Sequence, residues 1–107
     1  MRYYKYLYVQ EGLEKKKDKI IKKLDKKKLQ PNLHVITLAS NPENNLDIIS
    51  GKFLFQPSFP LDNLFVVGIV KSYDDAIAFV ERIIQEVYDK TGGTDIRSYI
   101  LGKEQDS

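Results

Sequence analysis

Few residues in this chain have a type and spacing that could support chemistry. There is no cysteine and one histidine, His34. Metal sites combine several His, Cys or carboxylate ligands at short spacing, and no such ligand stands beside His34, whose neighbours are Leu33 and Val35. We therefore interpret His34 as a structural residue near the start of a strand, and we expect neither a metal site nor a cofactor.

Two further groups match catalytic signatures only in part. Asp74 and Asp75 could form a carboxylate pair for acid–base catalysis, but acidic residues in a first helical turn are also explained by the helix dipole. The stretch TGGTD, residues 91–95, lacks the lysine and the spacing of a phosphate-binding loop. No catalytic residue is predicted, and the sequence favours a protein without enzymatic activity while leaving that question open.

The strongest charged feature is the run KKKDKIIKKLDKKK, residues 15–28. Residues 14–28 hold nine lysines and three acidic residues, a local excess of +6 in a chain of net charge +2, which leaves −4 for the remainder. On a helix, one stripe would gather Lys15, Lys19, Lys22 and Lys26.

Such a stripe could neutralise nucleic-acid phosphates. The segment offers no aromatic, Asn or Gln side chain to stack on or read a base, and its acidic residues Asp18 and Asp25 can pair with Lys22. A solvated helix face is therefore the favoured interpretation, and weak nucleic-acid binding is the alternative.

Two short stretches resemble the RNA recognition motif family. LYVQEGL is similar to its first motif and KFLFQ to its second, which would make Tyr8, Phe53 and Phe55 the base-stacking aromatics. The second motif carries Lys52 where the family has glycine, and the apolar run LFVVGIV follows it instead of a helix. The resemblance is confined to these two stretches.

Hydrophobic patterns predict the elements that would position these residues. Alternating aromatics in YYKYLYVQ and the apolar runs LHVITLAS, LFVVGIV and DIRSYIL predict four strands. The uninterrupted run LFVVGIV is typical of a central strand that is covered on both faces. A helix is predicted from Leu13 to before Pro31, and another from the N-cap Ser72 to Gly92.

The segment 42–56 is ambiguous. Asn41 as an N-cap followed by Pro42 favours a helix, whose buried face would hold Leu46, Ile49 and Phe53. The alternative is a hairpin of LDII and KFLF around Ser50-Gly51.

The favoured order is β-α-β-α-β-α-β, which predicts an α/β fold: a single small layered domain with a mostly parallel four-stranded sheet. With a hairpin in 42–56, the alternative is a ferredoxin-like α+β sandwich with an extra hairpin. We expect one domain over residues 1–101 and a disordered polar tail over 102–107. The N-terminus does not resemble a signal peptide and no apolar run could span a membrane, so a cytoplasmic location is expected.

In open α/β sheets, ligands bind beyond the carboxyl ends of the strands, beside helix N-termini. The predicted topology places six residues there as candidates for binding an anion or a small molecule: Gly12, Ser40, Asn41, Lys71, Ser72 and Tyr73. The simpler interpretation is that Asn41 and Ser72 only cap their helices.

Residues 65–101 also resemble a group of small bacterial proteins of similar length that have no assigned activity. The stretches VVGIVKSYDDAIAFVERI and DIRSYIL carry this resemblance. It implies a bacterial, cytoplasmic α/β protein and no particular mechanism.

These observations favour a non-enzymatic cytoplasmic domain that acts through protein–protein contacts, including a homodimer, because aromatic residues of YYKYLYVQ or DIRSYIL would lie at a sheet edge. A small-molecule or anion-binding domain is the first alternative. Weak nucleic-acid binding through the lysine-rich helix is the second.

Overall fold

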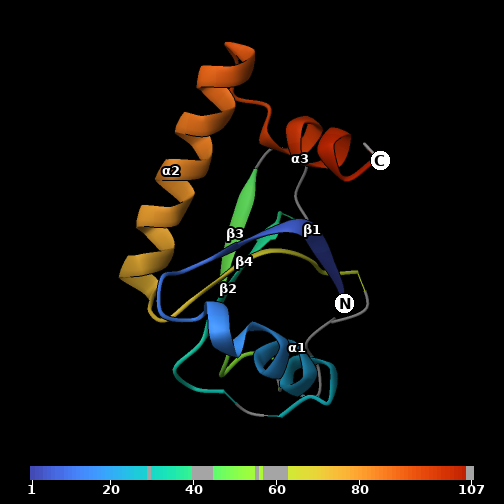
Figure 1. Ribbon diagram of the computed structural model, residues 1–107, viewed down its shortest axis with the longest axis vertical. Coiled ribbons are helices and arrows are strands. Elements are labelled where there is room, and N and C mark those ends of the chain that lie inside the picture. The colour runs from blue at the N-terminus through green and yellow to red at the C-terminus, as the bar shows by residue number, and fades with distance from the viewer. Residues whose placement is uncertain (29, 40–44, 55, 57–62, 106–107) are drawn as a thin grey trace.

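The computed structural model describes residues 1–28, 30–39, 45–54, 56 and 63–105, and forms one α/β domain (Figure 1). The strands are β1 (Arg2–Val9), β2 (His34–Leu38), β3 (Leu46–Ser50) and β4 (Phe65–Val70). The helices are the 3-10 turn η1 (Glu14–Lys16), α1 (Lys17–Asp25), α2 (Tyr73–Thr91) and α3 (Ile96–Gln105). Within these residues no helix is long and apolar enough to cross a membrane.

The sheet is mixed and has the strand order β1-β4-β2-β3. Only β1 and β4 are parallel, whereas β2 runs antiparallel to both β4 and β3. The prediction of a central strand at 64–70 is confirmed, because β4 lies between two strands and all six of its residues are buried. The predicted mostly parallel sheet was wrong, and so was the ferredoxin-like alternative, whose β-α-β-β-α-β order ends on a strand.

The first cause of this difference is the segment 42–56. Residues Leu46–Ser50 form strand β3, which pairs with β2 from Leu38↔Leu46 to His34↔Ser50. The favoured helix and the LDII/KFLF hairpin are both wrong here, since residues 51–54 form a turn and Phe53 is exposed. Adjacent β-branched isoleucines favour a strand, and the free edge of β2 gives it a partner. Asn41 and Pro42 lie outside the described residues.

The second cause is the segment DIRSYIL, which forms helix α3 instead of a strand. Asp95 acts as its cap: its carboxylate accepts hydrogen bonds from the Ser98 backbone N–H at 3.1 Å and from the Ser98 hydroxyl at 2.8 Å. Ile96 and Ile100, four residues apart, are fully buried on one face of the helix. The helix includes residues 102–105 of the segment expected to be a tail.

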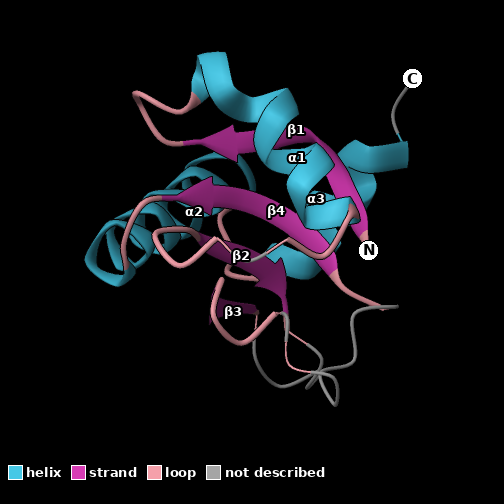
Figure 2. Ribbon diagram, turned by 90° about the horizontal axis from the view of Figure 1, so that it is seen from below, coloured by secondary structure: helices cyan, strands magenta, loops and turns pink. Residues whose placement is uncertain are grey.

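Helices cover both faces of the sheet (Figures 1 and 2). On one face, α2 and α3 pack against β1, β2 and β4 through a cluster that includes Ile36, Val67, Ile83 and Ile100. On the other face, α1 contributes Ile20 and Leu24 to a second cluster, which also holds Leu13, Val35, Leu54, Val66 and Ile69. The predicted helix is therefore present, but α1 covers only Lys17–Asp25 of the span expected from Leu13 to before Pro31.

A tyrosine network fastens β1 to α2 and α3. The hydroxyls of Tyr8 and Tyr99 donate hydrogen bonds to the same Glu86 oxygen, at 2.7 and 3.0 Å. Burial, followed by the hydrogen bond to Glu86, raises the pKa of Tyr8. Burial, followed by the proximity of Tyr99 and Glu86, raises the pKa of Tyr4 to about 12.

These shifts predict a loss of stability at alkaline pH. Tyrosines ionise near pH 10 in an unfolded chain, so the folded state, which keeps Tyr4 and Tyr8 protonated, gains its full advantage below about pH 10 and loses it as the pH rises through the folded values. The urea concentration at which half of the protein is unfolded should therefore decrease as the pH is raised from about 8 to about 11.5. Tyr8→Phe, which keeps the ring, should show a smaller fall, and equal falls in both proteins would contradict this account.

Candidate functional site

Four of the six predicted binding residues do meet at one end of the sheet. Because β1 and β4 are parallel, their carboxyl ends bring Gly12 beside Lys71 and the start of α2: a Cβ on Gly12 would lie 2.8 Å from Lys71 Nζ. The Lys71 backbone N–H donates to the Gln10 side-chain oxygen at 2.6 Å. Ser72 caps α2 by accepting a hydrogen bond from the Asp75 N–H at 3.1 Å.

These polar groups are engaged with one another. Hydrogen bonds from Gln10, first, and from Ser72 lower the pKa of Asp75. Asp75 and Asp74 thus occupy the first turn of α2, where the helix dipole favours carboxylates. The polar groups at this end of the sheet cap α2 and hold the residues after β1 against the residues after β4.

The other two predicted residues, Ser40 and Asn41, lie outside the described residues. They follow Ala39, and β2 runs antiparallel to β4. The last residue of β2, Leu38, therefore lies at the opposite end of the sheet from Lys71 and Ser72. The prediction of a shared crevice assumed a mostly parallel sheet, in which β2 would end on the same side as β4, and the antiparallel direction of β2 removes that basis.

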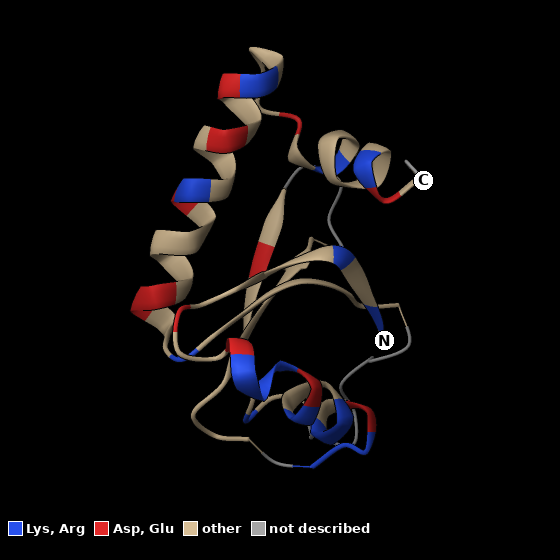
Figure 3. Ribbon diagram, viewed as in Figure 1, with Lys and Arg blue, Asp and Glu red and all other residues tan. Residues whose placement is uncertain are grey.

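The lysine-rich segment forms an exposed basic surface, and the charge separation read from the sequence exists in space (Figure 3). Lys15, Lys19, Lys22 and Lys26 are all exposed around η1 and α1. Most of the acidic residues of α2 lie across the sheet from them. Asp25 accepts a hydrogen bond from the Tyr3 hydroxyl at 2.9 Å, so it contributes to holding α1 against β1.

The described aromatic residues of the RNA recognition motif resemblance and the histidine His34 have surroundings that do not indicate a binding site. Phe53 lies in a turn and Tyr8 is bonded to Glu86, an arrangement unlike the paired stacking strands of the RNA recognition motif family. The His34 ring lies edge-on to Tyr73, with centroids 6.4 Å apart, and its buried Nδ1 has no hydrogen-bond partner. Among the described residues, no three His, Cys, Asp or Glu side chains are grouped to hold a metal ion.

A pocket of about 710 Å³ opens at the other end of the sheet, where β2 ends and where β1, β3 and β4 begin. This volume falls within the range of roughly 300–1,000 Å³ typical of small-molecule sites. Its lining is mostly apolar, with two arginines, one carboxylate and two neutral polar side chains. The lining residues are Arg2, Thr37, Leu38, Ala39, Asp47, Ile49, Asn63, Leu64, Phe65, Arg97 and Leu101.

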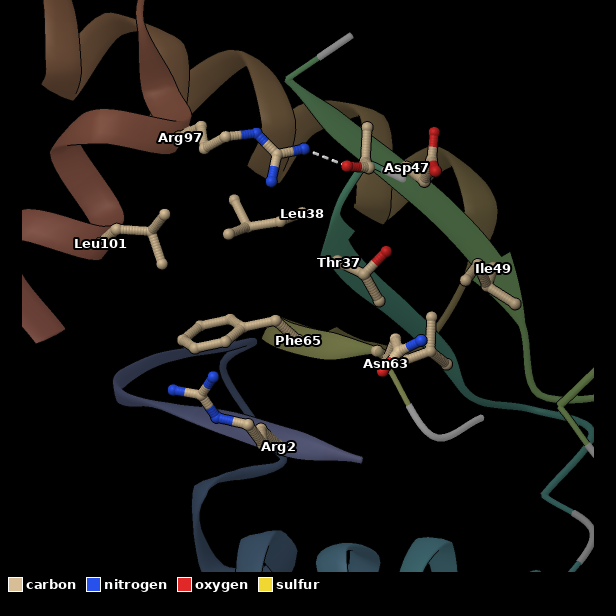
Figure 4. Close-up of a pocket in the computed structure, with 11 residues that line it drawn as sticks. Arg2, Thr37, Leu38, Asp47, Ile49, Asn63, Phe65, Arg97 and Leu101 are labelled. Atoms are coloured by element: carbon tan, nitrogen blue, oxygen red, sulfur yellow. Dashed lines mark hydrogen bonds between the residues drawn. The ribbon is translucent and has the colours of Figure 1, made fainter. Parts of the chain in front are cut away.

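Two arginines from opposite ends of the chain meet at this pocket (Figure 4). Arg2 begins β1, where its backbone N–H donates to the Leu64 carbonyl at 2.8 Å, and its guanidinium lies 5.0 Å from the centre of the Phe65 ring. Arg97 projects from α3 and donates a hydrogen bond to the Ala39 carbonyl oxygen at the end of β2. Figure 4 shows the two guanidinium groups on either side of Leu38 and Phe65.

Thr37 supplies an unsatisfied polar group to the same pocket. Its side chain is 1% exposed, and its hydroxyl has no hydrogen-bond partner. A buried hydroxyl without a partner costs roughly 1–3 kcal/mol relative to one that is bonded. A bound polar group would remove that cost.

This arrangement suits a molecule with an acidic group and an apolar body. A guanidinium has five N–H donors and can bind two oxygens of a carboxylate or phosphate group at once, through two parallel hydrogen bonds. Arg97 uses one of its donors on the Ala39 carbonyl oxygen, and within the described residues its other N–H groups remain for a ligand. Leu38, Phe65 and Leu101 provide apolar contact area beside the two charges.

Sequence reasoning did not identify this pocket, because Arg2 and Arg97 are distant in the chain and α3 was predicted to be a strand. One signal was present: Asp95 three residues before Ser98 marks a helix start, and Ile96 and Ile100 then place Arg97 on a defined side of that helix.

The chain matches no protein-family model, no curated protein and no solved structure, so its own residues carry the functional conclusion.

Proposed function

We propose that this protein is a non-enzymatic binding domain for a small organic acid, a carboxylate or a phosphate ester joined to an apolar body. The observation that carries the proposal is the buried, unpartnered Thr37 hydroxyl in a pocket that two arginines border. The acidic group would bind the guanidinium group of Arg97 or of Arg2 where it borders the pocket, and a polar atom of the ligand would bond the Thr37 hydroxyl. The apolar body would contact Phe65 and Leu101.

The charges that line the pocket favour an anionic ligand over a cationic one. Two arginines against Asp47 leave a local excess of positive charge. Arg2 also stacks on an apolar ring and Arg97 is tied to a backbone carbonyl, so both guanidinium groups are held in place before a ligand binds. Preorganisation of this kind lowers the entropy cost of binding.

The test is an NMR titration of the whole chain with 3-phenylpropionate and, separately, with phenyl phosphate. We expect saturable shifts at Leu38, Phe65 and Leu101 with either or both acids, and at least about tenfold weaker binding of the neutral 3-phenylpropan-1-ol, since hydrogen bonds to charged groups contribute about 1.5–3 kcal/mol. No saturable shift with either acid, or equal binding of the alcohol, would refute the proposal.

Variants separate the pocket from nonspecific binding. Arg97→Gln should weaken acid binding at least about tenfold, and Thr37→Val should weaken it while leaving the free protein as stable or more stable. Arg82→Gln is the matched control, because Arg82 lies over the Phe79 ring at 4.9 Å on α2, away from the pocket. Equal effects of Arg97→Gln and Arg82→Gln would show that the acids bind elsewhere.

A further inference from the structure

Helix α2 carries a second apolar stripe that the domain itself leaves exposed. Its members are Tyr73 (55% exposed), Ile77 (38%), Ile84 (37%) and Tyr88 (55%). Spacings of four, seven and four residues place them on one side of the helix. The buried face of α2, which includes Ala76, Ile83 and Val87, is a separate set of residues. The stripe is therefore additional to the core.

The stripe lies on the flank of α2 that faces β3. Glu86 marks the other flank, because it bonds Tyr8 of β1 and Tyr99 of α3. Glu86 is two residues from Ile84, about 200° around the helix. The β1 and β3 strands are the two edges of the sheet, and so the exposed stripe runs along the β3 side.

Strand β3 leaves its outer edge unpaired in the part of the chain that the structure describes. It pairs with β2 on one side and is the last strand in the order. Its sequence LDIIS contains no proline or lysine, the residues that commonly protect an edge strand from pairing. An open strand edge, with Asp47 as its only charged residue, thus lies next to an exposed apolar stripe.

We propose that a second copy of this chain covers both features at once, by antiparallel pairing of β3 with β3 of the partner around a two-fold axis at Ile48. The two four-stranded sheets would then join into one sheet, with strands about 4.8 Å apart. The two α2 helices would lie on the same face of it with their stripes turned toward each other.

The strand sequence fits its own copy in this register. Ile48 lies opposite Ile48 of the partner subunit, and Asp47, the only charged residue of the strand, lies opposite an isoleucine instead of a second aspartate. β-branched residues pair favourably across strands, whereas directly opposed like charges are unfavourable. Isologous contacts of this kind close on themselves and end at a dimer.

The area also fits a second copy better than a single peptide. With roughly 150–250 Å² per aromatic side chain, the half-exposed Tyr73 and Tyr88 alone offer roughly 200 Å² of surface per subunit. A specific interface needs about 500 Å² or more per partner, so the stripe alone is too small and the β3 edge must add to it. An extended peptide would cover the edge, and only every second side chain would lie on the face that carries the stripe.

Sedimentation of the full chain tests the proposal. We expect a reversible dimer with a Kd between about 1 μM and about 1 mM. Ile84→Lys should raise this Kd at least about tenfold. Phe53→Lys is the matched control, because Phe53 is 52% exposed and belongs to the 51–54 turn, outside both the stripe and β3. A wild-type monomer at 1 mM, or a dimer that Ile84→Lys leaves intact, would overturn the proposal.

Cross-linking tests the register independently. The chain has no cysteine, so Ile48→Cys introduces a single thiol that the two-fold axis would bring next to its own copy. Mild oxidation should give a covalent dimer of Ile48→Cys, whereas Phe53→Cys should stay monomeric. Cross-linking of Phe53→Cys alone would place the interface elsewhere. If Ile84→Lys fails to fold by circular dichroism, the more exposed Tyr88→Lys replaces it.

Discussion

Gly51→Ala is expected to lower the free energy of unfolding by about 3 kcal/mol or more, at the upper end of the cost of overpacking. A Cβ at this position would lie 2.2 Å from the Gln30 carbonyl oxygen and 2.9 Å from that of Leu33. Both are backbone atoms, so no side-chain rotation can relieve the contact. Moving the chain apart would also break the 2.7 Å hydrogen bond from the Gly51 N–H to Leu33.

Urea unfolding of Gly51→Ala and Gly102→Ala checks this expectation. Gly102 is the matched control, because it lies within α3 and a Cβ there meets nothing within 4 Å. Alanine in a helix is more stable than glycine by roughly 0.5–1 kcal/mol, so Gly102→Ala should stabilise slightly. A Gly51→Ala protein as stable as the wild type would show that the chain near residue 30 can yield.

Leu54→Ala should lower the free energy of unfolding by about 2–5 kcal/mol, the range for removing a buried leucine side chain. Leu54 is 0% exposed and packs in the cluster beneath α1, together with Leu24 and Val35. Its loss would leave a cavity where the 51–54 turn closes this core.

The neighbouring Phe53→Ala is the control for that experiment, since Phe53 is 52% exposed. Exposed substitutions usually change stability by no more than about 0.5 kcal/mol. In urea denaturation, Leu54→Ala should therefore lose several kcal/mol more unfolding free energy than Phe53→Ala, although the two residues are adjacent. Equal costs would mean that the turn does not bury Leu54 as described.

Local sequence sufficed for helix α2, whose two ends are both marked by capping residues. Helix α2 begins after the predicted N-cap Ser72 and ends at the predicted Gly92, which adopts the left-handed conformation that such a helix end requires. The uninterrupted apolar run of β4 likewise predicted a strand buried on both faces. These signals are local, so neighbouring chain segments could not alter them.

Strand β3 and helix α3 required the tertiary structure. The segment LDIIS has a pattern compatible with a helix or a strand, and its pairing with β2 decided the outcome, because backbone hydrogen bonds to a neighbouring strand depend on residues outside the segment. For α3, the Asp95–Ser98 cap and the burial of Ile96 and Ile100 outweighed the strand preference of Ile and Tyr.

The sequence by itself determined a cysteine-free chain with a basic helix, an acidic helix and a central apolar strand, since these follow from composition and from periodicity within single segments. Only the tertiary structure decided strand direction, and with it which strand ends lie together at one end of the sheet. Parallel pairing of β1 with β4 brought Gly12 to Lys71, while the antiparallel direction of β2 sent its carboxyl end to the pocket of Arg2 and Arg97. Strand direction depends on contacts between distant segments, and no local pattern in this chain encodes it.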